Sequence, residues 1–184
     1  MSFRYDRAVR QLLEGGVIGY PTEAVWGLGC DPWNESAVST LLYLKSRPVE
    51  KGLILIGADV QQFAWLTHSL STGQQAKLEL TWPGPTTWLV PHHGLVPAWI
   101  CGAFDTVAIR VSAHRGVAEL CRSWGGPLVS TSANPAGCQP ATEAFQCRRY
   151  FGSELDEICS GRVGSARRPS LIRDLTTDQI IRHG

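Results

Sequence analysis

Apolar and polar positions recur at changing intervals along the chain, and each change predicts a different element. Residues 5–13 place apolar side chains at the spacing of an amphipathic helix, and two glycines follow as its C-cap. Residues 17–20 and 53–56 are short apolar runs, which are typical of buried strands. Asn34 is suited to begin the next helix as its N-cap, and that helix should end near Lys45, ahead of a proline.

The rest of the chain continues to interleave helices and strands. Asp59 and Ser71 can each cap a further helix, and the Trp82-Pro83-Gly84-Pro85 stretch should break the chain before an extended segment. Glycines and prolines scattered through residues 91–103 predict a loop. The remaining predicted elements are strands at 86–90, 107–111, 128–130, 170–174 and 179–182, and helices at 116–124 and 142–150.

The connections between these elements indicate the class of fold. Several predicted strands are separated by too little chain for a crossover helix, so we expect a mixed sheet rather than a purely parallel one. A length of 184 residues suits one domain with a sizeable core, and we see no linker or internal repeat. We therefore predict an α/β fold in which residues 1–184 form a single domain with helices flanking a mixed sheet.

Composition narrows the classes of protein that remain. The chain is 43% hydrophobic and 18% charged with a net charge of +1, and no apolar run is long enough to span a bilayer. Its first residues lack the pattern of an export signal, so we expect a cytoplasmic protein without a membrane partner. Six scattered cysteines form no Cys-x-x-Cys pair, which predicts free, mostly buried thiols and no structural metal site.

The clearest chemical signal is a cationic segment, residues 45–51, with Lys45, Arg47 and Lys51 ahead of the apolar run at 53–56. Pro48 places these cations on a connection that we expect to be exposed, where they suit a polyanion such as a nucleotide triphosphate. A solvated loop that only aids solubility is an equal alternative. Classical phosphate loops and nucleophile elbows are absent from the sequence, so any reaction should depend on positioning and charge.

Other polar residues lie at the ends of predicted strands, at Thr22, Arg110 and residues 130–134. A Ser, Thr or Asn in such a turn more often caps the backbone than binds a ligand. Arg110 is harder to explain in that way, because a guanidinium on a strand needs solvent, a carboxylate or a phosphate.

These residues belong to five sequence motifs that occur in the same order in a known protein family. The chain resembles the YrdC-type threonylcarbamoyl-adenylate synthases, in particular their short bacterial form. The resemblance covers nearly the whole chain. The residues that carry it are Tyr20-Pro21-Thr22-Glu23-Ala24-Val25 with Gly27-Leu28-Gly29-Cys30-Asp31-Pro32, Leu44-Lys45-Ser46-Arg47-Pro48, Trp82-Pro83-Gly84-Pro85-Thr86, Val107-Ala108-Ile109-Arg110-Val111 and Ser130-Thr131-Ser132-Ala133-Asn134.

The resemblance implies an open, twisted α/β fold around a basic concave groove. It implies a nucleotidyltransferase that condenses L-threonine, bicarbonate or CO₂, and ATP into threonylcarbamoyl-AMP and pyrophosphate, with Mg²⁺ accompanying the triphosphate. Downstream threonylcarbamoyl-transferase proteins then use the product to modify tRNA.

The same resemblance assigns roles to individual residues. By motif, Lys45, Arg47, Ser132 and Asn134 would bind ATP, with Lys45 and Arg47 also stabilising charge in the reaction. Thr22, Arg110 and Ser130 would contact threonine. Near the end of the chain, Ser170 would help enclose threonine, and Arg182 would lie on the nucleotide side.

A non-catalytic module that binds tRNA or double-stranded RNA through the same basic groove is the alternative from another class. Such a module would serve tRNA or rRNA maturation without ATP turnover. The seven tryptophans form no basic-aromatic stacking pattern, which counts against it.

Overall fold

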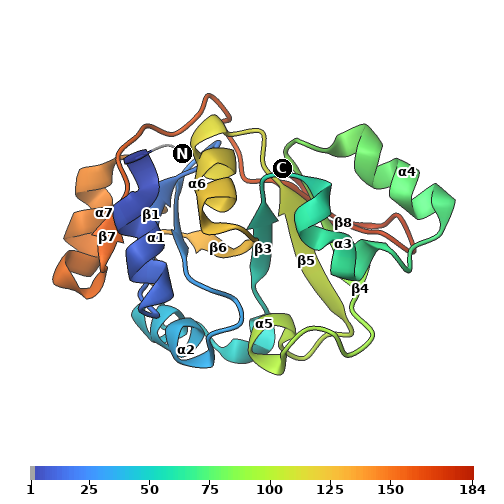
Figure 1. The fold of residues 1–184 in the computed structure, drawn as a ribbon, viewed down its shortest axis with the longest axis horizontal. Helices are drawn as coiled ribbons and strands as arrows, with labels where there is room; N and C mark the ends of the chain where they lie inside the picture. The colour runs from blue at the N-terminus through green and yellow to red at the C-terminus, as the bar shows by residue number, and fades with distance from the viewer. Residues whose placement is uncertain (1–2) are drawn as a thin grey trace.

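The computed structural model describes residues 3–184 and contains one nine-stranded sheet (Figure 1). Its spatial order is β7-β1-β2-β6-β3-β5-β4-β8-β9. The strands are β1 (Ile18–Pro21), β2 (Trp26–Gly29), β3 (Ile54–Gly57), β4 (Thr86–Pro91), β5 (Thr106–Val111), β6 (Leu128–Ser132), β7 (Glu157–Ile158), β8 (Leu171–Asp174) and β9 (Ile180–Arg182).

The sheet is mixed, as predicted. β3 lies between a parallel neighbour, β5, and an antiparallel neighbour, β6. The helices on the connections are α1 (Asp6–Leu13), α2 (Glu35–Leu44), α3 (Ala64–Thr67), α4 (Thr72–Thr81), α5 (Ala98–Cys101), α6 (Arg115–Trp124) and α7 (Ala144–Phe151).

Capping side chains begin the helices where the sequence predicts them. Asn34 accepts a hydrogen bond from the Ala37 amide at the start of α2, and Ser71 forms a capping box at the start of α4. Asp59 accepts from the Gln62 amide, but the element that it begins is a short 3₁₀ helix, Val60–Phe63. Local hydrogen bonding of this kind needs no distant partner, so sequence alone can indicate it.

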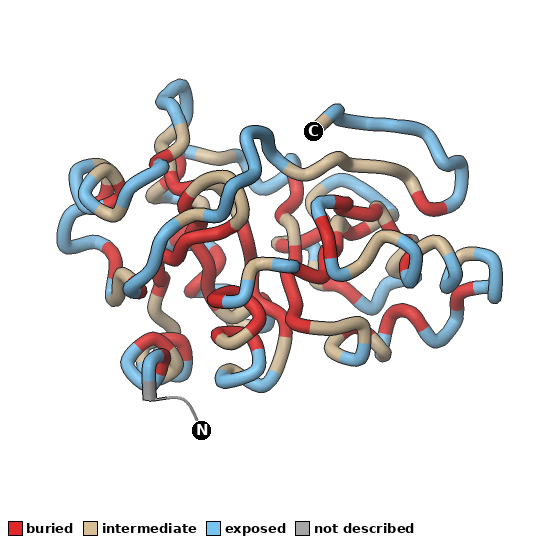
Figure 2. The backbone as a smooth tube through the Cα atoms, turned by 90° about the horizontal axis from the view of Figure 1, so that it is seen from above, coloured by how far each residue is buried: buried red, intermediate tan, exposed pale blue. Residues whose placement is uncertain are grey.

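Successive strand residues face two separate apolar clusters, one on each side of the sheet. Ile56 and Leu128 belong to the cluster that α1 and α6 cover. Their neighbours Leu55 and Val129 point to the opposite face and join the larger cluster. Figure 2 shows the buried positions running through the middle of the molecule, while β9 near the C-terminus is exposed.

One prediction of local structure was wrong. Residues 91–103 are not simply a loop, because they contain the last residue of β4 and the short helix α5. Gly27-Leu28-Gly29 lies in β2, where the glycines allow neighbouring backbones to approach closely. A Cβ atom on Gly29 would lie 2.5 Å from the carbonyl oxygen of Val129 on the opposite strand.

The cysteines are free throughout the described chain; five are buried and Cys138 is exposed. Among residues 3–184, no helix is both long enough and apolar enough to cross a membrane.

Candidate functional site

A cavity of about 250 Å³ lies where the ends of β2, β6 and β3 meet. Predicted site residues from six separate segments of the chain line it. They are Thr22, Arg47, Arg110, Ser130, Ser132, Ser170 and Arg182. Lys45 and Asn134, the other two predicted site residues, are not among the residues that line it. The strand-end argument selected Thr22, Arg110, Ser130 and Ser132, and the cationic segment supplied Arg47. Ser170 and Arg182 were assigned by the family resemblance alone, and the cavity brings all of these residues together.

The turn between β1 and β2 supplies one end of the cavity. The Thr22 hydroxyl donates to the carbonyl oxygen of Val25 at 2.7 Å, so this side chain closes the turn as well as lining the cavity. Backbone amides of Gly164 and Ala166 donate to the carbonyls of Thr22 and Glu23 at 2.9 and 3.1 Å. The segment before β8 is thereby held over the same turn.

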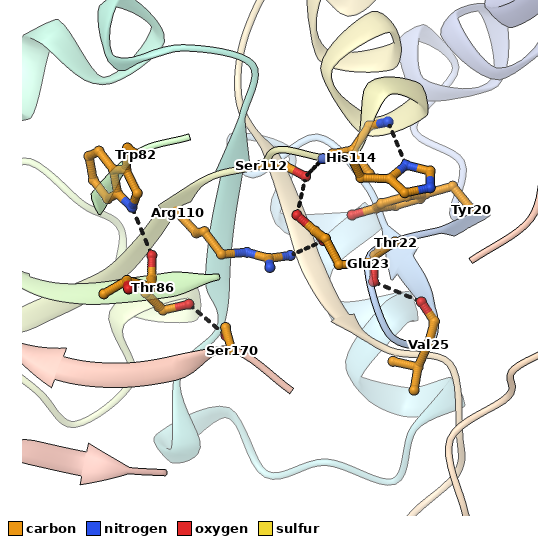
Figure 3. A network of polar contacts seen from close by, with 12 residues as sticks. Tyr20, Thr22, Glu23, Val25, Trp82, Thr86, Arg110, Ser112, His114 and Ser170 are labelled. Atoms are coloured by element: carbon orange, nitrogen blue, oxygen red, sulfur yellow. Dashed lines mark hydrogen bonds and ion pairs between the residues drawn. The ribbon is translucent and has the colours of Figure 1, made fainter. Parts of the chain in front are cut away.

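Arg110 on β5 points into this end and pairs with Glu23 (Figure 3). Its Nη2 lies 3.1 Å from Glu23 Oε2, and both side chains are largely buried, with exposed fractions of 10% and 16%. Among the described residues, Glu23 is the only carboxylate that pairs with Arg110. This partner comes from a turn that is distant in sequence and becomes a neighbour only through the sheet.

A chain of hydrogen bonds fixes the Glu23 carboxylate. The Ser112 hydroxyl donates to Glu23 Oε1 at 2.7 Å and accepts from the amide of His114 at 3.1 Å. His114 is also the N-cap of α6. Burial acts to raise the pKa of Glu23, but the Arg110 charge and the Ser112 hydrogen bond outweigh it and hold the pKa below its usual value. Glu23 is therefore ionised at neutral pH.

Lys45 lies in a different environment from the one that the sequence predicted. It is 5% exposed, not on an exposed loop, because the end of α2 packs against the turn after β6. Its Nζ donates to the carbonyl oxygens of Ser132 and Asn134, the latter at 2.8 Å. Burial, with a smaller effect of the Arg47 charge, lowers the pKa of Lys45 to about 8.

Asn134 likewise serves the turn in which it lies. Its Nδ2 donates to the carbonyl oxygens of Pro135 and Cys138 at 3.1 and 2.8 Å. Its Oδ1 is buried and has no partner among the described residues. The backbone-capping role that is common for Asn in turns is thus present here.

Arg47 stands at the boundary of two cavities. It is half-buried, and its Nη2 donates to the carbonyl oxygen of Gly52 at 2.8 Å. The second cavity, of about 240 Å³, has a mainly apolar wall that includes Leu89, Ile100 and Ile172. Arg47 and Arg182 line both cavities, so these two cations form part of the shared wall.

The last two strands complete the site. The hydroxyls of Ser170 and Thr87 share a hydrogen bond of 2.8 Å, which ties the start of β8 to β4. Arg182 on β9 donates to the carbonyl oxygen of Ser170 at 2.8 Å and to its hydroxyl at 3.2 Å. Ser170 and Arg182, predicted for different substrates, are thus direct neighbours.

Nothing in the described part of the chain forms a metal cage, since no three His, Cys, Asp or Glu residues gather there. Glu23 is the one acidic residue among those that line the first cavity, and Arg110 and Ser112 occupy its oxygens. These residues do not fit a resident divalent cation.

Sequence reasoning did not assign Glu23, Thr87 or Arg168 to the site. Glu23 follows Thr22 at the same strand end, so the argument that selected Thr22 could have selected it too. Thr87 is fully buried in β4 and contacts Ser170, and Arg168 lies before β8 and lines the cavity. Only the assembled sheet brings these two residues to their places.

Comparison with protein families gives one match that covers most of the chain. Residues 10–184 match the Sua5/YciO/YrdC family, described as "Telomere recombination". The chain is 55% identical over 179 residues to a threonylcarbamoyl-AMP synthase of Cellvibrio japonicus, covering 97% of this chain and 95% of that protein. It is 56% identical to the threonylcarbamoyl-AMP synthase of Pseudomonas aeruginosa, covering 98% and 97%.

Solved structures agree on the fold. Sua5 of P. abyssi in complex with L-threonine superposes with a TM-score of 0.85 at 31% identity, over 92% of this chain and 50% of that one. The present chain thus spans about half the length of that protein. YciO of E. coli has a TM-score of 0.84 at 23% identity, covering 96% of this chain and 87% of that one.

Proposed function

This chain belongs to the Sua5/YciO/YrdC family, and from that premise we propose that it is a threonylcarbamoyl-AMP synthase. It condenses L-threonine, bicarbonate or CO₂, and ATP into threonylcarbamoyl-AMP and pyrophosphate. The observation that carries this proposal is identity of 55% to a synthase of that name across nearly the full length of both chains. The same relatives favour an enzyme over a non-catalytic RNA-binding module.

The two cavities suggest how the substrates divide. We assign threonine to the first cavity, with its carboxylate at Arg110 and with Thr22, Ser130 and Ser170 around it. A guanidinium can hold a carboxylate through two parallel hydrogen bonds, which suits this position. The P. abyssi Sua5 complex contains L-threonine, which supports an amino-acid subsite within the shared fold.

The nucleotide is assigned to the second cavity and to the wall between the two. Its apolar lining suits a base and ribose, and Arg47 and Arg182 on the shared wall suit phosphates. Ser132, also assigned to the nucleotide, lines the first cavity. The carbamate formed on threonine's amine and the α-phosphate would then meet at the shared wall.

The chemistry follows from that placement. Threonine's amine and bicarbonate give a carbamate and water, and a carbamate oxygen attacks the α-phosphorus while pyrophosphate leaves. Arg47 and Arg182 stabilise the negative charge that develops on the phosphate oxygens. Lys45 contributes in this geometry by holding the carbonyls of Ser132 and Asn134. Direct contact of Lys45 or Asn134 with the nucleotide stays a prediction.

Mg²⁺ enters this proposal with the triphosphate rather than as a resident ion, because the described residues offer no cage for it. The setting that we propose is the cytoplasm, where downstream threonylcarbamoyl-transferase proteins would take up the product for tRNA modification. Contact with tRNA or double-stranded RNA through the arginine-lined cavity also stays a prediction.

Pyrophosphate release tests the proposed function directly. Purified protein with ATP, L-threonine and bicarbonate should release pyrophosphate, and omission of either threonine or bicarbonate should abolish the release. Mass spectrometry should show threonylcarbamoyl-AMP only in the complete mixture. Release that is independent of threonine, or salt-resistant RNA binding with no ATP turnover, would exclude this function.

A further inference from the structure

The first cavity is not uniformly cationic. Four arginines line it, Arg47, Arg110, Arg168 and Arg182, together with a single acid, Glu23. Glu23 forms its ion pair with Arg110. Among residues 3–184, Arg47 and Arg182 pair with no carboxylate and donate to carbonyls or a hydroxyl. Glu23 therefore compensates the charge of Arg110, whereas Arg47 and Arg182 on the wall shared with the second cavity are not compensated by a carboxylate.

The pairing leaves Arg110 able to bind a ligand. Its only polar contact within the described chain is the one between Nη2 and Glu23 Oε2, whereas a guanidinium carries five N–H donors. Arg110 also lines the cavity, and its other donors have no partner within the described chain. Arg110 can thus still grip a carboxylate, but it does so beside a fixed negative charge.

The negative charge is held there by the fold. Ser112 is buried, donates to Glu23 Oε1, and is itself fixed by the amide at the N-terminus of α6. The Glu23 carboxylate can therefore neither turn to Arg47 or Arg182 nor leave the cavity without breaking this chain of bonds. Figure 3 shows the carboxylate lying between Ser112 and Arg110.

We infer that Glu23 is a positioning and specificity residue that sorts the zwitterionic amino acid and the anionic triphosphate between the ends of the site. This inference rests on the proposed function, in which an amino acid and a triphosphate bind side by side. A zwitterion has no net charge and complements the Arg110–Glu23 pair, whereas a triphosphate is repelled by Glu23 and attracted to Arg47 and Arg182. Without Glu23, the triphosphate could occupy the Arg110 end and exclude threonine.

The decisive variant is Glu23→Gln, which keeps the shape of the side chain and removes its charge. The probes are L-threonine and inorganic tripolyphosphate, both followed by calorimetry. In the wild type, saturating tripolyphosphate should leave threonine affinity unchanged within about twofold. In Glu23→Gln, tripolyphosphate should compete with threonine and reduce its apparent affinity by about tenfold or more, as like-charge exclusion is lost.

Two further variants separate charge from geometry. Ser112→Ala keeps the charge of Glu23 but frees its carboxylate, so threonine should bind more weakly without becoming competitive with tripolyphosphate. Glu79→Gln removes an exposed acid on α4, far from the cavity lining, and should change neither measurement. Competition in Glu23→Gln alone would identify the charge, rather than the packing, as the sorting element.

Salt dependence of the unmodified protein provides a test that no folding defect can obscure. Binding at a compensated pair should be nearly insensitive to ionic strength, whereas tripolyphosphate binding should weaken steeply as salt rises. Equal salt slopes for the two ligands, or a folded Glu23→Gln with no competition, would overturn the inference while leaving the synthase proposal intact. A wild type that binds no threonine would instead contradict the proposed function, and this inference with it.

Discussion

Lys45 and Arg47 lie two residues apart on one connection, yet the fold uses them in opposite ways. Lys45 is 5% exposed and donates to carbonyl oxygens of the turn after β6. Arg47 is half-buried, reaches both cavities, and has no acidic partner among the described residues. Lys45 therefore stabilises the fold, and Arg47 is available to a ligand.

The contrast shows that a cationic motif does not act as a single unit. The two residues belong to different local structures. Lys45 is the C-cap of α2, whereas Arg47 lies beyond the helix, just before Pro48, which is the N-cap of the next short helix. The side chain at the C-cap is still buried at the packed end of the helix, whereas the side chain two residues later is only half-buried. Methionine substitutions test this difference, since they remove the charge and keep an unbranched stem at either position.

Arg47→Met should have the largest effect of all the variants, and that effect should be on ATP use rather than on stability. The ATP concentration for half-maximal turnover should rise by about 10- to 100-fold, corresponding to roughly 1.5–3 kcal/mol for a lost charge-assisted bond. The free energy of unfolding should fall by about 1 kcal/mol or less, because Arg47 is partly solvated. Steady-state kinetics and urea denaturation measure the two quantities. Wild-type ATP dependence would remove Arg47 from the site.

Lys45→Met should instead act first on stability. Its loss leaves the carbonyls of Ser132 and Asn134 without their donor, while relief of a buried charge offsets part of the cost. We expect the free energy of unfolding to fall by about 2 kcal/mol. Urea denaturation at pH 7 measures this. If Lys45→Met matched Arg47→Met in stability, the contrast between the two cations would be wrong.

The pH dependence of stability provides a smaller but more specific signal. The pKa of Lys45 is about 8 in the folded protein, below the ordinary value of 10.5. Between these values the unfolded chain binds the proton and the folded protein does not, so stability contributed by this site rises with pH. Relative to Lys45→Met, the wild type should gain on the order of 1 kcal/mol between pH 7.5 and 9.5. A flat difference would contradict the burial of the ammonium group.

The smallest expected effect is the coupling between the two cations. The Arg47 charge contributes to the lowered pKa of Lys45, after burial. In an Arg47→Met background, the pH range over which Lys45 changes stability should therefore shift upward. Comparing Arg47→Met with the Arg47→Met/Lys45→Met double variant across the same pH series isolates this shift. A downward shift would mean that Arg47 does not repel Lys45.

Sequence alone was sufficient for features that depend on neighbouring residues. The caps at Asn34 and Ser71 bond to backbone amides within one turn, so a few adjacent residues determine where α2 and α4 begin. Polar residues at strand ends could also be selected locally. Thr22, Arg110 and Ser130, which were selected in this way, all line the first cavity.

Tertiary structure decided what depends on partners that are remote in the chain. β2 is a strand because Gly27 and Leu28 pair with Ser132 and Thr131, a contact that no local pattern encodes. The sheet also determines that Glu23 compensates Arg110 and that Lys45 is buried rather than exposed. Charge and burial are properties of the surrounding atoms, and those atoms come together only when the strands take their order.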